Sequence, residues 1–326
     1  MNDFLRVSGA EVFPAHLRGA VVAIGNFDGV HRGHQTVLSR ALEIAREQNR
    51  PAVVLTFEPN PRQVFQPDVP LFRLTPAPMK AQLLDLLGFD AVIEQKFDRD
   101  FAAIPRDMFE REILAEKLGA GCIVTGYDFH YGKARGGTSQ TLVEAGERQG
   151  FNVCIVEAFS DEGGEVISSS RIRKLLAQGS VAEAAGLLGY RYTVEAEISH
   201  GKKLGRTLGF PTANMALPAD VELAHGIYAV RLRRPDGTLF DGVASFGKRP
   251  TVDSDGEPLL ESFIFDFEGD LYGEVCTVSL FSFLRPELKF DGLDELVVQM
   301  KQDEAEARAL LAGMRPLSQL DLDLTF

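Results

Sequence analysis

The sequence has no tryptophan, only three cysteines and no long apolar run in its 326 residues. Because no stretch approaches the roughly 20 apolar residues that span a bilayer, we expect no membrane-spanning helix and no membrane partner. Cys122, Cys154 and Cys276 stand singly in strand-like apolar runs, without a CxxC pair. This is the pattern of buried, reduced thiols in the cytosol, so neither a disulfide nor a metal site is expected from them.

Positive charge is also scarce, since 34 Lys and Arg stand against 47 Asp and Glu and leave a net charge of −13. A general nucleic-acid-binding protein shows a basic face, so this balance argues against nucleic acid as a partner. An anionic substrate must therefore meet positive potential from loops and helix starts. Residues 1–17 contain Asp3, Arg6 and Glu11 and lack an apolar core, so we expect no secretion signal and a cytoplasmic location.

The first half of the chain alternates short apolar runs with amphipathic segments. The runs lie at 20–24, 52–57, 91–93, 122–125 and 153–156, and helical spacing separates them at 35–49, 77–87, 105–118 and 138–149. Near-continuous apolar strands joined by helices predict an α/β fold, a doubly wound parallel sheet covered on both faces. Ligands on such sheets bind at the carboxyl ends of the strands.

The pattern changes after about residue 188. Strand-like segments follow one another at 192–198, 227–232, 240–246, 259–267 and 275–284, with a helical pattern at 293–311. Strands without intervening helices predict a small antiparallel β-barrel with a C-terminal helix. The expected domain boundary lies in 186–191, after a short helical pair, so we divide the chain into domains 1–187 and 188–326. The oligomeric state is not readable from the sequence.

The most informative local feature is GNFDGVHRGH at residues 25–34, directly after the first apolar run. An apolar strand there leads into a glycine-bearing turn at the start of a helix. The amides at a helix start are free and the dipole end is positive, so the turn predicts a site for nucleotide phosphates.

Two histidines on this turn, His31 and His34, are the candidate catalytic residues. Nucleotidyl transfer is an in-line displacement, and imidazole donors can neutralise charge on phosphate oxygens without becoming covalent partners. Gly25, Asn26 and Asp28 are candidate phosphate-binding residues. Histidines at a helix start can also simply cap or pack, and Asp28 can equally be a turn residue.

A hydroxyl cluster near residue 168 leads into another helix. Ser168 and Ser169 are candidate phosphate ligands, although one of them is also expected to cap the helix. Arg171 and Arg173 follow, and guanidinium groups bind phosphates bidentately, so a second phosphate cradle is expected here.

Four motifs of the first half resemble the nucleotidyltransferase module of bacterial bifunctional riboflavin kinase/FAD synthetases: GNFDGVHRGH, TFEPNPR, GYDFHYGK and ISSSRIR. In the second half HGKKLGRTLGFPTAN, GVASFGKRPT, LLESFIFDFEGDLYGE and FLRPELKF resemble the riboflavin kinase module of that family. The resemblance covers almost the entire chain. It implies that the first module transfers AMP from ATP to FMN to give FAD and pyrophosphate, and that the second phosphorylates riboflavin to FMN, each with Mg²⁺. It also implies that Asn60 and Asp128 help to bind the cofactor.

Some positions depart from the family pattern. Asn60 replaces a histidine, His130 an arginine and Ser170 a threonine, whereas Ser245, Phe246 and Lys248 replace residues of GVANIGTRPT. We expect these changes to affect rate and flavin affinity rather than reaction type.

The kinase half concentrates basic residues and glycines at 200–209 in an otherwise acidic chain. Glycines let backbone amides approach phosphate, although a solvated hairpin would look similar. The candidate phosphate-binding residues are Gly201, Lys203, Gly205, Arg206 and Gly209. Thr212 and Asn214 then offer two oxygens on one side of an extended segment, a hard ligand set for Mg²⁺ that the resemblance also assigns to them.

Glu261 is the candidate general base, because phosphorylation of an alcohol needs a group that accepts its proton. It lies near the apolar residues Leu260 and Phe263 on a predicted strand and matches the catalytic glutamate of the family, although an outward-facing strand glutamate is the plain alternative. Arg285, among the aromatics of 281–290, is a candidate to hold the isoalloxazine ring, and the phenylalanines there can equally belong to the barrel core.

Two other functions stay open at this point. One is a different adenylyltransferase, of the pantetheine-phosphate or nicotinate type, with a barrel that only binds a regulator. The PTAN segment together with Glu261 argues against it. The other is a flavin sensor without turnover, which the catalytic-type residues in both halves argue against.

Overall fold

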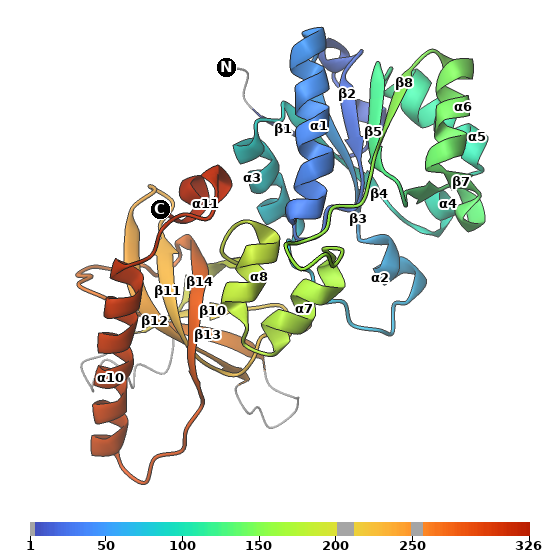
Figure 1. Ribbon diagram of the computed structural model, residues 1–326. Coiled ribbons are helices and arrows are strands. Elements are labelled where there is room, and N and C mark those ends of the chain that lie inside the picture. Colours follow the sequence, from blue (N-terminus) through green and yellow to red (C-terminus); the bar gives the residue numbers. More distant parts are fainter. Residues whose placement is uncertain (1–3, 201–211, 249–256) are drawn as a thin grey trace. The chain divides into compact units, whose positions relative to one another are not determined.

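The computed structural model describes residues 4–200, 212–248 and 257–326 (Figure 1). The chain forms two compact units, Met1–Ser169 and Ser170–Phe326, which we call the N-terminal and the C-terminal unit. The sequence predicts a domain boundary at 187/188, after the helical pair of residues 169–188. That boundary stays a prediction.

The N-terminal unit contains a six-stranded sheet in the order β1-β4-β3-β2-β5-β8, and all neighbouring strands are parallel. The strands are β1 (Leu5–Val7), β2 (Val21–Ile24), β3 (Ala52–Glu58), β4 (Ala91–Lys96), β5 (Cys122–Gly126) and β8 (Asn152–Val156). The chain builds the sheet to one side of β2 with β3 and to the other side with β5. The carboxyl end of β2 is therefore the topological switch point at which open α/β sheets bind ligands.

Helices cover both faces of this sheet, as the continuous apolar strands predict. The helices are α1 (Arg32–Gln48), α2 (Pro61–Phe65), α3 (Ala77–Leu87), α4 (Arg99–Ala102), α5 (Arg106–Met108), the π-helix η3 (Phe109–Lys117) and α6 (Ser139–Gln149). Helix α1 packs against four of the strands and α3 against β4. On the other face Val22, Leu55 and Ile123 join one core with Phe109 and Leu142.

Several short elements were not predicted. They are β1, the hairpin of β6 (His130–Tyr131) and β7 (Gly137–Thr138), helices α2 and α4, and the 3-10 turns η1 (Ala10–Val12), η2 (Ala15–Leu17) and η4 (Lys133–Arg135). The helix expected over 105–118 is present, but most of it is a π-helix. Two to five residues carry too little periodic signal to be recognised in a sequence.

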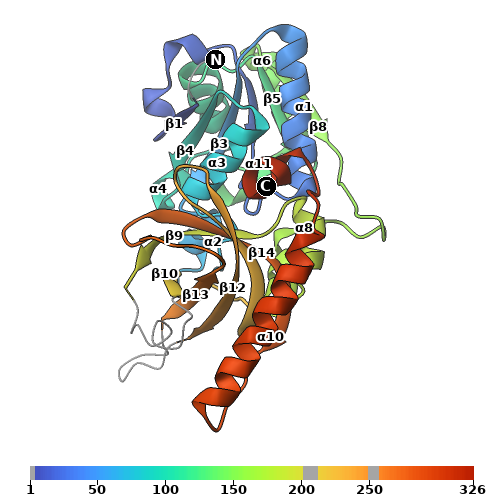
Figure 2. The same cartoon turned by 90° about the vertical axis from the view of Figure 1, so that its left-hand side faces the viewer.

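The C-terminal unit is built around a closed barrel in the order β10-β13-β12-β11-β14-β9, with antiparallel neighbours (Figure 2). Its strands are β9 (Thr193–Ser199), β10 (Thr212–Ala216), β11 (Gly226–Arg233), β12 (Leu239–Lys248), β13 (Pro258–Ile264) and β14 (Val275–Pro286). Met215, Leu260 and Phe246 pair across three neighbouring strands and are at most 1 % exposed, so they fill the barrel interior. The doubly wound sheet and the barrel predicted from the sequence are both confirmed.

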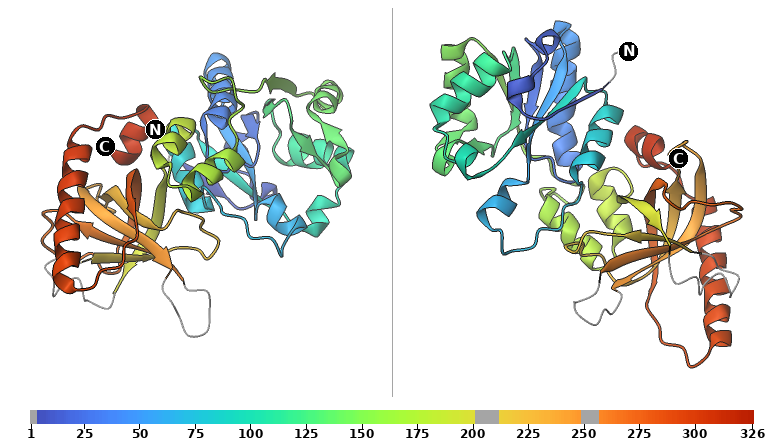
Figure 3. Two further views of the ribbon diagram at one scale, coloured as in Figure 1. Left: turned by 60° about the horizontal axis from the view of Figure 1, so that its bottom comes forward. Right: turned by 180° about the vertical axis from the view of Figure 1, so that it is seen from behind.

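Among the described residues, the helices that flank the barrel are α7 (Ser169–Ala177), α8 (Val181–Leu188), α10 (Leu293–Ala312) and α11 (Gln319–Thr325). Helix α10 runs along the outside of the barrel and packs on β11, β12 and β14 (Figure 3). The unpredicted α11 is fastened by a buried ion pair between Arg191 and Asp321. Over residues 4–200, 212–248 and 257–326, no helix is both long and apolar enough to cross a membrane.

Candidate functional site

The turn after β2 is strained. Phe27 and Val30 lie in the left-handed region, with φ of 47° and 37°, and Gly29 between them has φ of 89°. A non-glycine residue in this region costs on the order of 1–3 kcal/mol and persists only where its surroundings hold it. At the start of the turn a Cβ on Gly25 would lie 2.9 Å from the Phe27 ring, so glycine is required there. A strained turn at the switch point is typical of a functional site.

His31 and His34 stack on each other at the start of α1, with ring centroids 3.6 Å apart. His31 is the N-cap residue: its Nδ1 accepts a hydrogen bond from the backbone N–H of His34 at 3.3 Å. A neutral His31 therefore carries its proton on Nε2 and is a donor there. Burial, helped by His31 and Lys80, holds the pKa of His34 well below 6.5, so its imidazole is neutral at physiological pH. The sequence predicted that both histidines lie at the start of a helix, but it did not predict whether their rings are charged.

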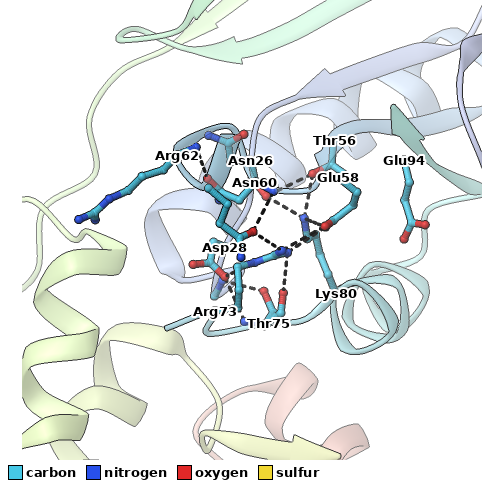
Figure 4. A network of polar contacts seen from close by, with 12 residues as sticks. Asn26, Asp28, Thr56, Glu58, Asn60, Arg62, Arg73, Thr75, Lys80 and Glu94 are labelled. Atoms are coloured by element: carbon cyan, nitrogen blue, oxygen red, sulfur yellow. Dashed lines mark hydrogen bonds and ion pairs between the residues drawn. The ribbon is translucent and has the colours of Figure 1, made fainter. Parts of the chain in front are cut away.

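Side chains from distant segments hold this turn (Figure 4). The backbone N–H of Gly29 donates to Thr75 Oγ1 at 2.8 Å, and the backbone N–H of Thr75 donates to Asp28 Oδ1 at 3.1 Å. The Ser169 hydroxyl donates to the carbonyl of Asp28 at 2.8 Å. Asp28 and Ser169, both predicted to bind phosphate, thus support the turn itself, and their contact with phosphate stays a prediction.

Next to the turn lies a group of buried charges that the sequence reasoning missed. Lys80 is 2 % exposed, and its Nζ donates at 3.0 Å each to the Asn26 carbonyl, Thr56 Oγ1 and Glu58 Oε1. Arg73 donates twice to the Glu58 carboxylate, at 2.8 and 3.1 Å. Burial lowers the pKa of Lys80 from 10.5, although Glu58 opposes this shift. Burial would raise the pKa of Glu58, but Arg73 and Lys80 together lower it.

The other residues of this half that were predicted to bind phosphate or cofactor differ in burial and in hydrogen bonding. Asn60 is the N-cap of α2, and its Oδ1 accepts from the backbone N–H of Arg62 at 3.0 Å, a role that asparagine fills well. Ser168 and Asp128 are exposed. Arg171 and Arg173 lie on α7 and belong to the C-terminal unit. The cofactor-binding role of all of these residues stays a prediction.

A chain of aromatic rings runs through the N-terminal unit and was not predicted. Neighbouring ring centroids lie 5.3 to 6.2 Å apart along Phe65, Phe97, Phe101, Phe109, Tyr131 and Phe129. Phe65 ends this chain on α2, just after the carboxyl end of β3, and is 64 % exposed. An exposed aromatic ring at a ligand-binding edge is suited to stacking on a planar ligand.

A cavity of about 580 Å³ opens along α1 and the edge strand β8, between Arg32, Arg40, Glu43, Cys154 and Phe159 among others. None of Asn26, Asp28 and His31 lines it. The cavity borders residues 25–34 only at Arg32 and does not include the candidate phosphate-binding residues, so we assign no ligand to it.

In the C-terminal unit the barrel register brings the predicted kinase residues together. Glu261 on β13 stands directly opposite Asn214 on β10 and opposite Ser245 on β12. Directly opposed side chains in antiparallel strands have Cβ atoms about 4.5–5.5 Å apart. Thr212, two residues before Asn214, shares its face of β10. The candidate general base and the two candidate metal ligands thus form one cluster on the outer face of the barrel.

Arg285 belongs to the same row across the barrel, because Ile227 pairs with Ser245 on one side and with Arg285 on the other. Its guanidinium donates to both carboxylate oxygens of Asp303 on α10, at 2.8 and 2.6 Å. Asp303 is 3 % exposed, so this pair fixes the arginine firmly. The flavin contact predicted for Arg285 stays a prediction. The five phosphate-binding candidates between Gly201 and Gly209 lie outside the described residues.

The donor set around Glu261 fits Mg²⁺ better than a softer metal. Thr212 and Asn214 carry hydroxyl and amide oxygens, and the Asn214 Nδ2 donates to the Thr212 carbonyl at 3.2 Å, which fixes the amide plane. Mg²⁺ keeps several waters and takes few protein ligands besides substrate phosphates. In the described part of the chain, no three His, Cys, Asp or Glu side chains form a metal cage.

Comparison with known proteins gives consistent results for both halves of the chain. The family model for FAD synthetase matches residues 13–171, and the model for riboflavin kinase matches residues 188–311. Proteins called bifunctional riboflavin kinase/FMN adenylyltransferase are similar along nearly their whole length. The Haemophilus influenzae protein is 41% identical over 90% of this chain and 94% of its own, and the Escherichia coli K12 protein 39% identical over 91% and 95%. The Bacillus subtilis protein is 35% identical over 91% and 94%.

A solved structure is similar over both units. It is that of a Streptococcus pneumoniae protein described as a macrolide-efflux protein, with a TM-score of 0.82 and 32% sequence identity. The match covers 94% of this chain and 98% of that one. The succession of a parallel sheet and a closed barrel is therefore shared with a protein whose structure is known by experiment.

Proposed function

This chain belongs to the bifunctional riboflavin kinase/FMN adenylyltransferase family, and we propose that its two reactions use separate sites, one at the turn of residues 25–34 and one around Glu261. The enzyme phosphorylates riboflavin to FMN with ATP and then adenylylates FMN to FAD, with release of pyrophosphate. One observation carries the proposal of separate sites: the stacked histidines and the Glu261–Asn214 pair belong to different compact units.

For adenylyl transfer we place the phosphates of ATP at the start of α1. A phosphate oxygen of FMN attacks the α-phosphorus, and the bond from that phosphorus to pyrophosphate breaks. The Nε2–H of His31 and the first amides of α1 would donate to the charge that builds up on the non-bridging oxygens. His34, neutral and stacked beneath His31, holds that ring in place. Exposed Phe65 offers a face on which the isoalloxazine ring of FMN can stack.

For the kinase reaction we place the terminal hydroxyl of riboflavin beside Glu261. Its oxygen attacks the γ-phosphorus of ATP, its proton passes to the Glu261 carboxylate, and ADP leaves. Thr212 and Asn214 would hold a Mg²⁺ ion, which when bound neutralises charge on the ATP phosphates. Arg285 and the segment 201–209 are kept as flavin and phosphate ligands on the strength of the family resemblance.

The finer assignments also remain proposals. We propose that Asn60, Asp128, Ser168, Arg171 and Arg173 contact the nucleotide or the flavin. We propose a cytoplasmic location, because Cys122, Cys154 and Cys276 are free thiols, as is usual for proteins of a reducing compartment. The small-molecule substrates are the proposed partners, with no nucleic acid among them.

Two variants test the separation of sites, with products followed by chromatography in riboflavin, ATP and Mg²⁺. Glu261→Gln keeps the size of the side chain but removes the base, so FMN formation should fall by about 10²–10⁴-fold, while added FMN is still converted to FAD. His31→Ala should lower FAD formation by about 10²-fold or more and leave FMN formation intact.

Glu195→Gln is the matched control, since Glu195 is an exposed glutamate on β9 of the same barrel and should leave both rates unchanged. Loss of both reactions in a folded Glu261→Gln or His31→Ala protein would show that the sites are not separate.

A further inference from the structure

We propose that Lys80 is a positioning residue for adenylyl transfer, whose buried ammonium group holds the Asn26 carbonyl and thereby fixes the strained turn that carries His31. This inference rests on the proposed adenylyl-transfer site. Lys80 lies on α3, which is far from the turn in the sequence and close to it in the fold (Figure 4).

The hydrogen bonds of Lys80 show that it acts through other residues. An ammonium group has three protons and no acceptor capacity. All three find partners within the protein, namely the Asn26 carbonyl, Thr56 Oγ1 and Glu58 Oε1, each at 3.0 Å. Lys80 would have to give up one of these bonds to donate to a phosphate. Its effect on the reaction must therefore be indirect.

The Asn26 carbonyl is the point at which Lys80 acts on the turn. This oxygen accepts from Lys80 at 3.0 Å and from the Thr56 hydroxyl at 3.2 Å. The peptide that carries it leads directly into Phe27, the first left-handed residue of the turn. Two donors on one carbonyl fix the orientation of that peptide, which is what a strained backbone needs in order to persist.

A purely structural role would not require a charge at this position. The other buried side chains of α3 include Met79, Leu83 and Leu84, so an apolar residue would extend the same packing. Burying an ammonium group is costly, and Arg73 already donates to both oxygens of the Glu58 carboxylate, so Glu58 keeps a counter-ion without Lys80. What an apolar residue cannot supply is the bond to the Asn26 carbonyl.

Lys80→Met tests the inference, because methionine keeps the length of the side chain and removes all three donors. We expect kcat for FMN adenylylation to fall by about 10- to 100-fold, with KM for FMN changed less than about threefold. The riboflavin kinase rate of the same chain should not change. The matched control is Lys96→Met on β4, where the side chain is 79 % exposed, and it should keep both rates.

Thermal unfolding monitored by circular dichroism shows whether a lower kcat comes from a misplaced turn or from an unfolded protein. The assays are run well below the first transition of each variant, so that an unfolded fraction does not lower kcat. Thr56→Val is a milder second variant, since it removes only the hydroxyl donor from the same carbonyl, and it should lower kcat by about 3- to 10-fold. If Lys80→Met proves unfolded, the Thr56→Val result decides the question alone.

The inference is wrong if Lys80→Met is folded and its kcat lies within twofold of the parent. If Lys80→Met is unfolded, an unchanged kcat in Thr56→Val shows that the inference is wrong. His31→Ala is assayed in parallel. If His31→Ala retains FAD formation, the proposed site itself is wrong. If His31→Ala is inactive while Lys80→Met is normal, only the role of Lys80 is wrong.

Discussion

Lowering the pH should destabilise the N-terminal unit through His34. Burial, with smaller contributions from His31 and Lys80, holds the pKa of this imidazole well below its usual 6.5. Between the folded and the unfolded pKa, the unfolded chain binds a proton that the folded chain does not. The free energy of unfolding therefore rises with pH in this window, and it decreases as the pH falls below 6.5.

The size of the effect follows from the same comparison. At pH 7.5 an unfolded histidine is mostly neutral, and the contribution is close to zero. At pH 5.5, one unit below 6.5, the unfolded histidine is largely protonated, whereas His34 binds a proton less readily because its pKa is lower. The folded state then loses at most about 1.4 kcal/mol relative to pH 7.5, which is the limit set by protonation of the unfolded histidine.

Urea unfolding at pH 7.5 and 5.5 measures this loss, with each unit fitted as its own transition. Carboxylates contribute to the same pH range, so the informative quantity is the difference between the parent and His34→Gln. The variant should lose less than the parent over this range, by up to about 1.4 kcal/mol. His16→Gln, at an exposed position on η2, is the control for histidine removal. Equal losses in the parent and His34→Gln would refute a neutral buried His34.

Two further predictions concern single hydrogen-bonded groups. Thr75→Val removes the acceptor of the Gly29 amide. It should lower kcat/KM for FAD formation by about 5- to 100-fold and leave FMN formation unchanged. The rates of both reactions are measured in one preparation, and equal losses in both would contradict the prediction. Asp321→Asn breaks the buried pair with Arg191 and should lower the free energy of unfolding of the C-terminal unit by about 3 kcal/mol, as read from its urea transition. A transition midpoint that does not move would show that this pair does not fasten α11.

Much of the fold was predictable because its signals are local. Strands buried on both faces must be largely apolar, so β2 and β3 are visible as runs of four apolar residues and β5 as a run of three. The histidine pair could be placed for the same reason, since a strand, a glycine turn and a helix start follow one another directly. In the barrel, the strand-like segment 259–267 predicted β13, whereas β10 was expected only as an extended segment, and the pairing register of the two strands could only come from the structure.

What the sequence could not show are contacts between segments that lie far apart along the chain. Lys80 looks like an ordinary polar position of an amphipathic helix, and nothing near it indicates that its ammonium group is buried. Thr75 lies in a connecting segment, 46 residues from the amide that it binds. Asn60 was read through a family pattern as a cofactor ligand, whereas the local sequence Asn-Pro also fits the N-cap that the structure shows.

The charges around the turn indicate how an acidic chain can hold phosphates. Lys80 and Arg73 are matched by Glu58 and Asp28, so this buried group carries no net charge toward a ligand. His34 is neutral as well. In the proposed site, the attraction that the turn itself offers to phosphates then comes from oriented dipoles, namely the first amides of α1 and the Nε2–H of His31, while Arg171 and Arg173 are the proposed charged contacts. Dipoles attract a phosphate only when they point at it, and the buried ions serve to keep the turn in the one conformation that aims them.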